Sequence, residues 1–467
     1  MNRTGKPPAA TPLAFHGGTA GALLPLLVFL AGVAALGLAG APDERGFWPI
    51  LLAGLAVGLL LARDRTAYAE ALLQGMSRPI VMLMVLAWLL AGVLGSLVGA
   101  SGFVGALVDV AARAGVSGGS YVLTAFLIAA ALSTSTGTSL GTLIICVPLL
   151  YPAAGALGAE PVWLIGAILA GATFGDNISP VSDTTIASAT TQEADIGGVV
   201  RSRLKYALPA GAVAAIVYAM FGGASVGVEG VSAGADLIRA GSLRPLIMLL
   251  PPSLTVVMLL RRAHLVPSLM VGIVSAATLG VAADLFNPGD LLHIDREAFI
   301  ARGILLEGME RGVGISVFTL LLMGLVGGVE AAGLMDRLVA RAERAASTPA
   351  RAEWSIFGAV SAAVLLTTHS VVAILAVGRL ARDVGPDLSI SRYRRANILD
   401  VTVCTYPFLL PFFIPTILAG SLTGSGADFG VARVTALEAG LANLYSWGLL
   451  VVLLAAIATG RGRSEGD

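Results

Sequence analysis

Five ionisable residues of this sequence lie inside long apolar segments, where a charge is costly. Asp176, Asp183 and Asp400 interrupt two of these segments, and Glu330 and His369 lie in two others. A carboxylate at the depth of a lipid bilayer costs a few kcal/mol or more, so such a residue indicates a functional site. We expect no Lys or Arg in the interior of these segments. A site with acids and no bases favours a cation over a phosphate or a dicarboxylate.

The residues around these aspartates supply the oxygen atoms that a small hard cation prefers. Gly175 and Pro180 are expected to break the helix that carries Asp176 and to free backbone carbonyls. Two hydroxyl-rich stretches at 133–139 and 367–370 bring further oxygens. The candidate ion- or substrate-binding residues are Asp176, Asn177, Ser179, Ser182, Asp183, Thr184, Thr138, Ser139, Asn397, Asp400 and Thr402. Of these, Asp176, Asn177 and Asp400 form the expected sodium site.

Each of these residues also has a purely structural interpretation. A hydroxyl in a membrane helix often bonds back to the preceding turn, and Asp183 could cap the half-helix that begins after Pro180. Glu330 lies close to the end of its segment and could simply reach water. His369 could be linked to a proton or could only line a polar surface.

The composition indicates an integral membrane protein. Of the 467 residues, 56% are hydrophobic and 12% are charged, and the mean hydropathy is +0.87. So few charges cannot cover a water-soluble surface. The 29 basic and 29 acidic residues cancel, which gives no footprint for nucleic acid. Cys146 and Cys404 both fall in apolar segments, so a disulfide scaffold is excluded.

Runs of about 20 apolar residues predict an all-α bundle of ten transmembrane helices and two re-entrant hairpins. The hairpins are expected at 121–152 and 354–378, each broken by its hydroxyl-rich stretch. Spans at 162–191 and 397–420 are interrupted by polar residues and proline. The first apolar run is too long for a signal peptide and is kept as a span. The other spans are expected at 20–41, 47–62, 79–99, 206–222, 243–260, 265–285, 313–332 and 441–459.

The two halves of the chain show the same order of segments. Each half has three spans, an interfacial segment, a hairpin, a broken span and a closing span, in opposite orientations. Inverted repeats with interrupted helices are typical of secondary transporters, whose sites lie at the interruptions; a passive bundle kinked at glycines is the structural alternative. The expected parts are a tail at 1–19, a first repeat at 20–222, an external linker at 223–242, a second repeat at 243–459 and a tail at 460–467. Most of the 29 Lys and Arg residues then lie on one side, which places both termini in the cytoplasm.

A motif around the first break resembles the NhaC-type sodium/proton antiporter family of the ion transporter superfamily. That family's signature is G-x-x-F-G-D-x-x-S-P-x-S-D-T-T, and this chain matches it at 171–185. Residues 136–142 look like the hairpin motif of the same family, and 397–401 look like its second-half counterpart. The resemblance implies that Asp176, Asn177, Ser179, Ser182, Asp183 and Thr184 line the path of the ion or substrate, joined by Thr138, Ser139, Asn397 and Asp400. One departure is Leu399, which precedes Asp400 where better-known members carry a glutamate.

The leading hypothesis is a secondary transporter, a sodium/proton antiporter in which both ions compete for one buried carboxylate. The alternative is a sodium- or proton-coupled transporter or exchanger of a small organic solute, such as an organic acid or an amino acid. An intramembrane aspartyl protease, whose motif is only partly matched at 174–176, and a structural membrane subunit are weaker hypotheses.

No enzyme activity and no cofactor are expected. The expected partners are the lipid bilayer, sodium ions and protons, without nucleic acid; a homodimer is compatible with the sequence. The Ala-, Gly- and Arg-rich composition indicates a bacterial inner membrane.

Overall fold

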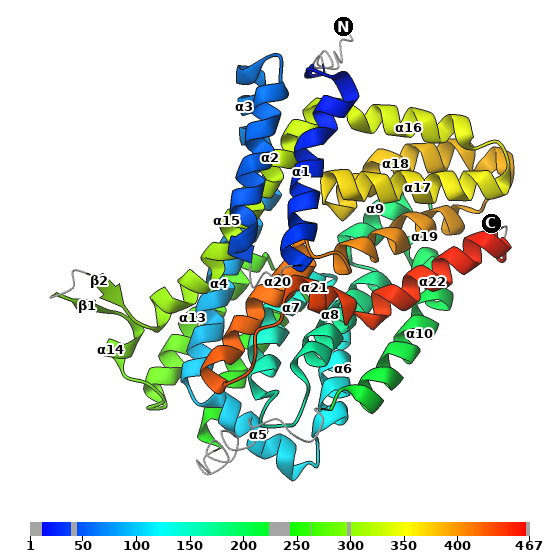
Figure 1. Ribbon diagram of the computed structural model, residues 1–467. Helices are drawn as coiled ribbons and strands as arrows, with labels where there is room; N and C mark the ends of the chain where they lie inside the picture. The colour runs from blue at the N-terminus through cyan, green and yellow to red at the C-terminus, as the bar shows by residue number, and fades with distance from the viewer. Residues whose placement is uncertain (1–11, 39–43, 224–242, 262, 297–299, 464–467) are drawn as a thin grey trace, which may run out of the picture.

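The apolar stretches of the chain form helices, because a backbone surrounded by hydrocarbon must satisfy its own hydrogen bonds. A computed structural model describes residues 12–38, 44–223, 243–261, 263–296 and 300–463 (Figure 1). Within these residues, seven helices are long and apolar enough to cross a membrane, which confirms an all-α membrane protein with several spans. Nearly all of the predicted linker at 223–242, and residues 1–11 and 464–467 of the predicted tails, lie outside the described residues.

The first half follows the predicted order of segments. Of the four helices that precede α5, α1, α2 and α4 coincide with expected spans and α3 was not predicted, and α6 with α7 lies at the expected hairpin. The broken span is α8 with α9. The bounds are α1 (Gly18–Leu38), η1 (Glu44–Phe47), α2 (Trp48–Leu61), α3 (Arg65–Met76), α4 (Pro79–Ala100), α5 (Phe103–Arg113), α6 (Gly118–Thr136), α7 (Ser139–Leu150), η2 (Tyr151–Ala153), α8 (Pro161–Ile178), α9 (Asp183–Thr191) and α10 (Ile196–Phe221).

The helices of the second half also lie at predicted segments, with α14, α21 and two short strands between them. A two-stranded antiparallel pair, β1 and β2, projects from the bundle beside α14 (Figure 1). The hairpin is α17 with α18, and the broken span runs from α19 through η5 to α20. The bounds are η3 (Arg244–Leu249), α12 (Leu250–Leu260), α13 (Leu265–Ala282), α14 (Pro288–Leu291), β1 (His293–Asp295), β2 (Ile300–Arg302), α15 (Ile304–Ala331), α16 (Leu334–Ala345), α17 (Pro349–Thr367), α18 (Ser370–Val384), η4 (Pro386–Leu388), α19 (Arg392–Val403), η5 (Tyr406–Phe408), α20 (Ile414–Leu422), η6 (Thr423–Phe429), α21 (Ala436–Leu441) and α22 (Leu444–Thr459).

Two helices begin well before the residue predicted for them. α10 begins at Ile196 and not at residue 206, because the side chain of Asp195 caps it by accepting a hydrogen bond from the backbone N–H of Gly198. α15 begins at Ile304 and not at residue 313. The longer α10 carries Arg203, whose side chain is fully buried. The prediction that no arginine lies inside the bundle is therefore wrong.

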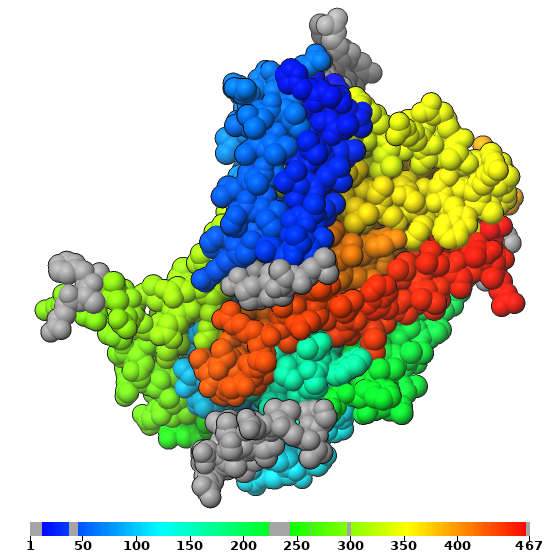
Figure 2. All heavy atoms as spheres, viewed as in Figure 1, coloured from blue at the N-terminus to red at the C-terminus, as the bar shows by residue number. Residues whose placement is uncertain are grey.

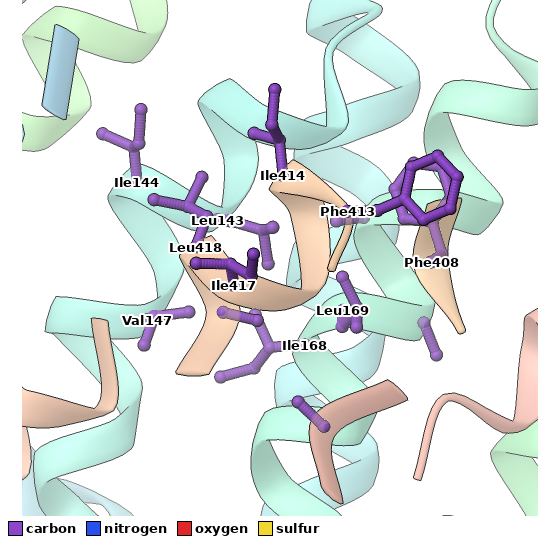
Figure 3. Packing of buried hydrophobic residues seen from close by; sticks show 14 of the residues in the cluster. Leu143, Ile144, Val147, Ile168, Leu169, Phe408, Phe413, Ile414, Ile417 and Leu418 are labelled. Atoms are coloured by element: carbon purple, nitrogen blue, oxygen red, sulfur yellow. The ribbon is translucent and has the colours of Figure 1, made fainter. Parts of the chain in front are cut away.

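Each hairpin packs against the broken span of the other half. α18 contacts α9 as well as α19, and α7 contacts α20 as well as α8. Figure 3 shows the second of these contacts, where aliphatic side chains of three helices meet: Leu143, Ile144 and Val147 of α7, Ile168 and Leu169 of α8, and Ile414, Ile417 and Leu418 of α20. In the space-filling view α22, in red, runs along the surface from the centre of the molecule to the C-terminus (Figure 2). The helices that bear the breaks are therefore held by contacts from both halves.

Two glycines one turn apart bring α8 against α6. A Cβ atom on Gly171 would lie 2.2 Å from the carbonyl oxygen of Phe126, and one on Gly175 would lie 2.4 Å from that of Ala130. Small residues at this spacing let two membrane helices approach closely, as lipid gives no hydrophobic force to bring them together. This contact fixes the half-helix that carries Asp176.

We predict that Gly171→Ala destabilises the protein by about 1–3 kcal/mol, the usual cost of overpacking. The new methyl group would push α8 away from the backbone of α6. Gly358→Ala is the matched control, because Gly358 lies on an exposed face of α17 with nothing within 4 Å of its added Cβ. That control should gain about 0.5–1 kcal/mol from helix propensity. Thermal unfolding of the two purified variants in detergent checks the pair; equal behaviour would contradict the packing argument.

Candidate functional site

A cavity of about 310 Å³ lies where both hairpin tips meet the break between α8 and α9. Its polar lining comes from three elements that are distant in the sequence. The first hairpin contributes its turn and the start of α7, the second contributes its turn, and the break contributes two carboxylates. These polar residues are Thr138, Ser139, Asp176, Asp183, Thr184, Thr368, His369 and Ser370. The hydroxyl-rich tips thus lie at one cavity, as the sequence predicts.

The two hairpin tips have the same backbone conformation. Gly137 and Thr368 end α6 and α17 in the left-handed region, with φ of 67° and 51°. The next residues, Thr138 and His369, are extended, with φ of −145° and −134° and ψ of 116° in both. A β-branched residue in the left-handed region is strained, and such strain concentrates at functional sites. Equivalent turns in the two halves are what an inverted repeat would produce.

Gly137 is also pressed against the break in the first half. A Cβ atom on it would lie 2.8 Å from the backbone N of Ser182. We predict that Gly137→Ala costs more stability than Gly158→Ala, although φ is +67° in one and +64° in the other. Both variants meet the left-handed penalty of about 1–2 kcal/mol, but the added Cβ of Gly158 has nothing within 4 Å. Thermal unfolding in detergent measures the difference, and equal losses would show that the tip does not press on the break.

Asp176 connects the break to the first hairpin. Its Oδ2 accepts a hydrogen bond of 3.3 Å from the backbone N–H of Ser139. Its Oδ1 has no hydrogen-bond partner among the described residues, and the side chain is only 7% exposed. A buried acceptor left without a partner is costly, so its presence at a cavity indicates a ligand.

Asp183 is the second carboxylate on the cavity wall. It is the first residue of α9 and it is exposed. Ser182 holds the N-cap position of α9 without a side-chain capping hydrogen bond, and the carboxylate of Asp183 interacts with the backbone N–H of Thr184 in the first turn. A carboxylate in the first turn is favoured by the helix dipole. Asp176 and Asp183 together place two acidic groups on one cavity.

Asp400 lies elsewhere, in a fully buried ion pair with Arg203. Its Oδ2 is 2.6 Å from Arg203 Nη2, and both side chains are 0% exposed. The hydroxyl of Ser188 donates a hydrogen bond of 3.1 Å to the same oxygen. Asp400 does not line the cavity. The predicted sodium set of Asp176, Asn177 and Asp400 is therefore not gathered around one opening.

Arg203 links helices of both halves through its remaining nitrogens. Its Nε donates to Asn397 Oδ1 at 3.0 Å, and its Nη1 donates to the carbonyl of Asn177 at 2.6 Å and to Thr185 Oγ1 at 2.8 Å. The carbonyl of Asn177 lies next to the break. Arg203 thus satisfies a backbone group near the break and neutralises Asp400 at the same time.

Most of the other predicted residues make structural contacts. The amide Oδ1 of Asn177 accepts from the Tyr445 hydroxyl at 2.8 Å. The hydroxyl of Ser179 donates to the carbonyl of Thr134 at 2.7 Å, which ties the break to α6. Ser182 and Thr184 share a hydrogen bond of 3.1 Å, and Thr402 bonds back to the carbonyl of Ile398. Outside the site, Glu330 forms an ion pair with Arg78 in which both side chains are partly exposed.

The sequence predicts Asp400, Asn397 and Asn177 as site residues but not Arg203, which contacts all three. The run at 201–205 carries three basic residues next to an apolar segment, a pattern that predicts a cytoplasmic flank. Asp195 is the sequence signal for the buried position of Arg203. An aspartate is a common N-cap, and a helix capped there begins at Ile196 and not at residue 206, so that it includes Arg203. Arg394 and Glu353 form a second buried ion pair at 2.9 Å, which was also not predicted. Among the residues that the structure describes, no three His, Cys, Asp or Glu side chains cluster as a metal site.

Comparison with known proteins supports the resemblance given by the motif. Residues 11–223 match the model of the Na+/H+ antiporter family. The chain is 29% identical over 269 residues to the Na(+)/H(+) antiporter NhaC of Bacillus subtilis. This aligned region covers 53% of this chain and 58% of the antiporter. The chain is also 27% identical over 227 residues to the Malate-2H(+)/Na(+)-lactate antiporter of the same organism, covering 47% of this chain and 48% of that one. The predicted relationship to NhaC-type proteins is confirmed.

These similarities do not extend over whole proteins. The chain spans about half the length of the curated relatives it matches. A solved structure of Neisseria gonorrhoeae MtrF aligns with 89% of this chain and 94% of that one, at 11% sequence identity and a TM-score of 0.37. A similarity at that level is too low to indicate a shared fold.

Proposed function

Because residues 11–223 relate this chain to the NhaC-type Na+/H+ antiporters, we propose that it is a secondary transporter that exchanges Na+ for H+ across a bacterial inner membrane. The observation that carries the proposal is the pair of carboxylates, Asp176 and Asp183, on a cavity bounded by both hairpin tips. Polar groups at interrupted helices are where secondary transporters bind their ions.

Asp176 and Asp183 are the ion-binding groups in this proposal. A Na+ ion takes several oxygen ligands, and the cavity offers two carboxylates with the hydroxyls of Thr138, Ser139 and Thr184 beside them. A carboxylate binds a proton or a cation but not both, so each Na+ that enters displaces protons. Asp400 has no part in this step, since Arg203 already neutralises it.

Trp88 marks the route by which the ion would reach one side of the membrane. Its side chain is 3% exposed, and it borders both the carboxylate cavity and a second cavity of about 300 Å³. Glu307 and Glu310 line the second cavity together with Arg45, Arg311 and Arg433, so side chains of both charges border this route. In the proposed cycle, movement of the hairpins against the broken helices opens one cavity and closes the other, as alternating access requires.

A second candidate is a Na+- or H+-coupled transporter of a small organic solute. The observation that favours it is the size of the carboxylate cavity, since about 310 Å³ lies within the range of about 300–1,000 Å³ typical of small-molecule sites. One relative is named as an antiporter of malate and lactate. In this case Asp176 would bind the coupling ion and the rest of the cavity would bind the solute.

Proton flux in everted membrane vesicles tests the proposal. Vesicles from an antiporter-deficient bacterial host that expresses this chain are energised to a steady proton gradient, and Na+ is then added. We expect dissipation of the gradient that depends on the Na+ concentration. A gradient that is unchanged by Na+ at every pH tested, with the protein verified in the membrane, would overturn Na+/H+ exchange and leave the organic solute as the working hypothesis.

A further inference from the structure

The wall of the carboxylate cavity combines negative charge with aromatic and aliphatic surface. Asp176 and Asp183 provide the charge, and Trp88 and Phe408 provide the aromatic rings. Among the described residues that line it, none is Lys or Arg, and the further ionisable side chains are those of His369 and Cys404. Most of the remaining wall is aliphatic. Such a wall suits a solute that has both a positive charge and an apolar part.

The buried arginine does not change the charge that a solute would meet. Arg203 is fully buried, does not line the cavity, and directs its nitrogens to Asp400, Asn397, Thr185 and a backbone carbonyl. A carboxylate solute would therefore approach the exposed Asp183 without a compensating cation, and like charges repel strongly where water is scarce. An ammonium group would be attracted instead.

The carboxylate of Asp176 provides an independent sign of a ligand. Its Oδ1 is buried and lacks a hydrogen-bond partner among the described residues, although the residue lies on the cavity wall. An ammonium group or a Na+ ion would satisfy this oxygen, whereas a carboxylate would not. Aromatic side chains attract ammonium groups through their π faces, and Trp is the most effective of them.

We infer that this cavity binds a small organic ammonium ion with an apolar substituent, held at the carboxylates of Asp176 and Asp183 with its apolar part among Trp88, Phe408 and the aliphatic wall. The inference rests on the proposed function, because it names the solute that the transporter would carry in addition to, or in place of, Na+. The inferred solute is a cation, whereas an organic acid is an anion at neutral pH.

Binding to the purified protein tests this directly. The probe is benzylammonium, whose N–H groups can donate to the unpartnered Oδ1 of Asp176, and phenylacetate, which carries the same benzyl group, is the matched probe of opposite charge. Thermal unfolding in detergent at about pH 8, above the ordinary pKa of imidazole, is recorded with each probe. A ligand that binds the folded state raises the unfolding midpoint. We expect a concentration-dependent rise with the ammonium and none with phenylacetate.

Two variants locate the effect. Asp183→Asn should remove the rise caused by benzylammonium. Asp64→Asn should preserve it, because Asp64 caps α3 at an exposed position outside the cavity. A rise that survives Asp183→Asn, a rise with phenylacetate, or no rise with either probe would overturn the inference.

The same protein in proteoliposomes separates this inference from the proposed function. Na+-dependent proton flux without any stabilisation by the ammonium probe would sustain Na+/H+ exchange and reject the organic ammonium. Stabilisation by the probe without Na+-dependent flux would reject Na+/H+ exchange and retain the ammonium site. We further expect the probe to raise the apparent KM for Na+ without changing the maximal rate, since both cations would occupy the same carboxylates.

Discussion

Replacement of Asp176 by Asn is expected to lower Na+-dependent proton exchange by about 100-fold or more. Loss of one charged contact is worth roughly 3 kcal/mol, and about 1.4 kcal/mol corresponds to tenfold in rate. The amide oxygen of Asn can still accept the hydrogen bond from the backbone N–H of Ser139, so the hairpin contact survives while the charge is lost. The measurement is the initial rate of Na+-driven proton movement in proteoliposomes that contain the purified variant.

Asp64→Asn is again the control, since it removes an aspartate of equal charge from an exposed helix cap. That variant should keep the exchange rate of the unmodified protein. Asp176→Asn protein that is folded, correctly inserted and within twofold of the normal rate would show that the exchanged ions do not use this carboxylate.

The buried ion pair gives the second large effect. Arg203→Gln leaves the carboxylate of Asp400 buried without its cation, and Asp400→Asn leaves the guanidinium in the same position. Loss of one partner of a buried pair typically costs about 3–5 kcal/mol, whereas loss of both costs much less. We expect both single variants to unfold at much lower temperature in detergent, and the double variant to recover most of the loss. Additive losses in the double variant would contradict the pairing.

Transport by the double variant distinguishes a structural role of Asp400 from a role as an ion ligand. Asp400 does not line the cavity, so we expect the folded double variant to retain Na+-dependent exchange. Complete loss of exchange in a double variant that is as stable as the unmodified protein would make Asp400 part of the ion path.

Local sequence signals were sufficient to predict the break and the first hairpin. Pro180 lies in the interruption, since the structure ends α8 at Ile178 and begins α9 at Asp183. The prediction that Gly175 breaks the helix is wrong, because Gly175 lies inside α8, where it packs against α6. Gly137 gives the turn between α6 and α7 because glycine adopts the left-handed conformation without strain. Both kinds of residue act on the backbone within a few positions, so their effects can be inferred without knowledge of the tertiary structure.

Long-range partners could not be predicted in this way. Arg203 and Asp400 are far apart in the sequence, and nothing in the residues next to either of them indicates the other. A basic residue at the edge of an apolar segment normally lies at the membrane surface, and only its tertiary contacts make a buried position tolerable. The position of the second hairpin tip follows from the hydroxyl-rich stretch at 367–370, but its backbone conformation could not be predicted, because Thr368 is in the left-handed region without a residue type that favours it.

Release of protons on Na+ binding tests the central claim most directly. Purified protein in a weakly buffered detergent solution is titrated with NaCl, and KCl serves as the ionic-strength control, while a pH indicator follows free protons. If Na+ displaces protons from Asp176 and Asp183, then NaCl acidifies the solution in the unmodified protein and does so to a smaller extent in Asp176→Asn and Asp183→Asn. Binding of Na+ without release of protons, or equal release in Asp176→Asn, would contradict exchange at these two carboxylates.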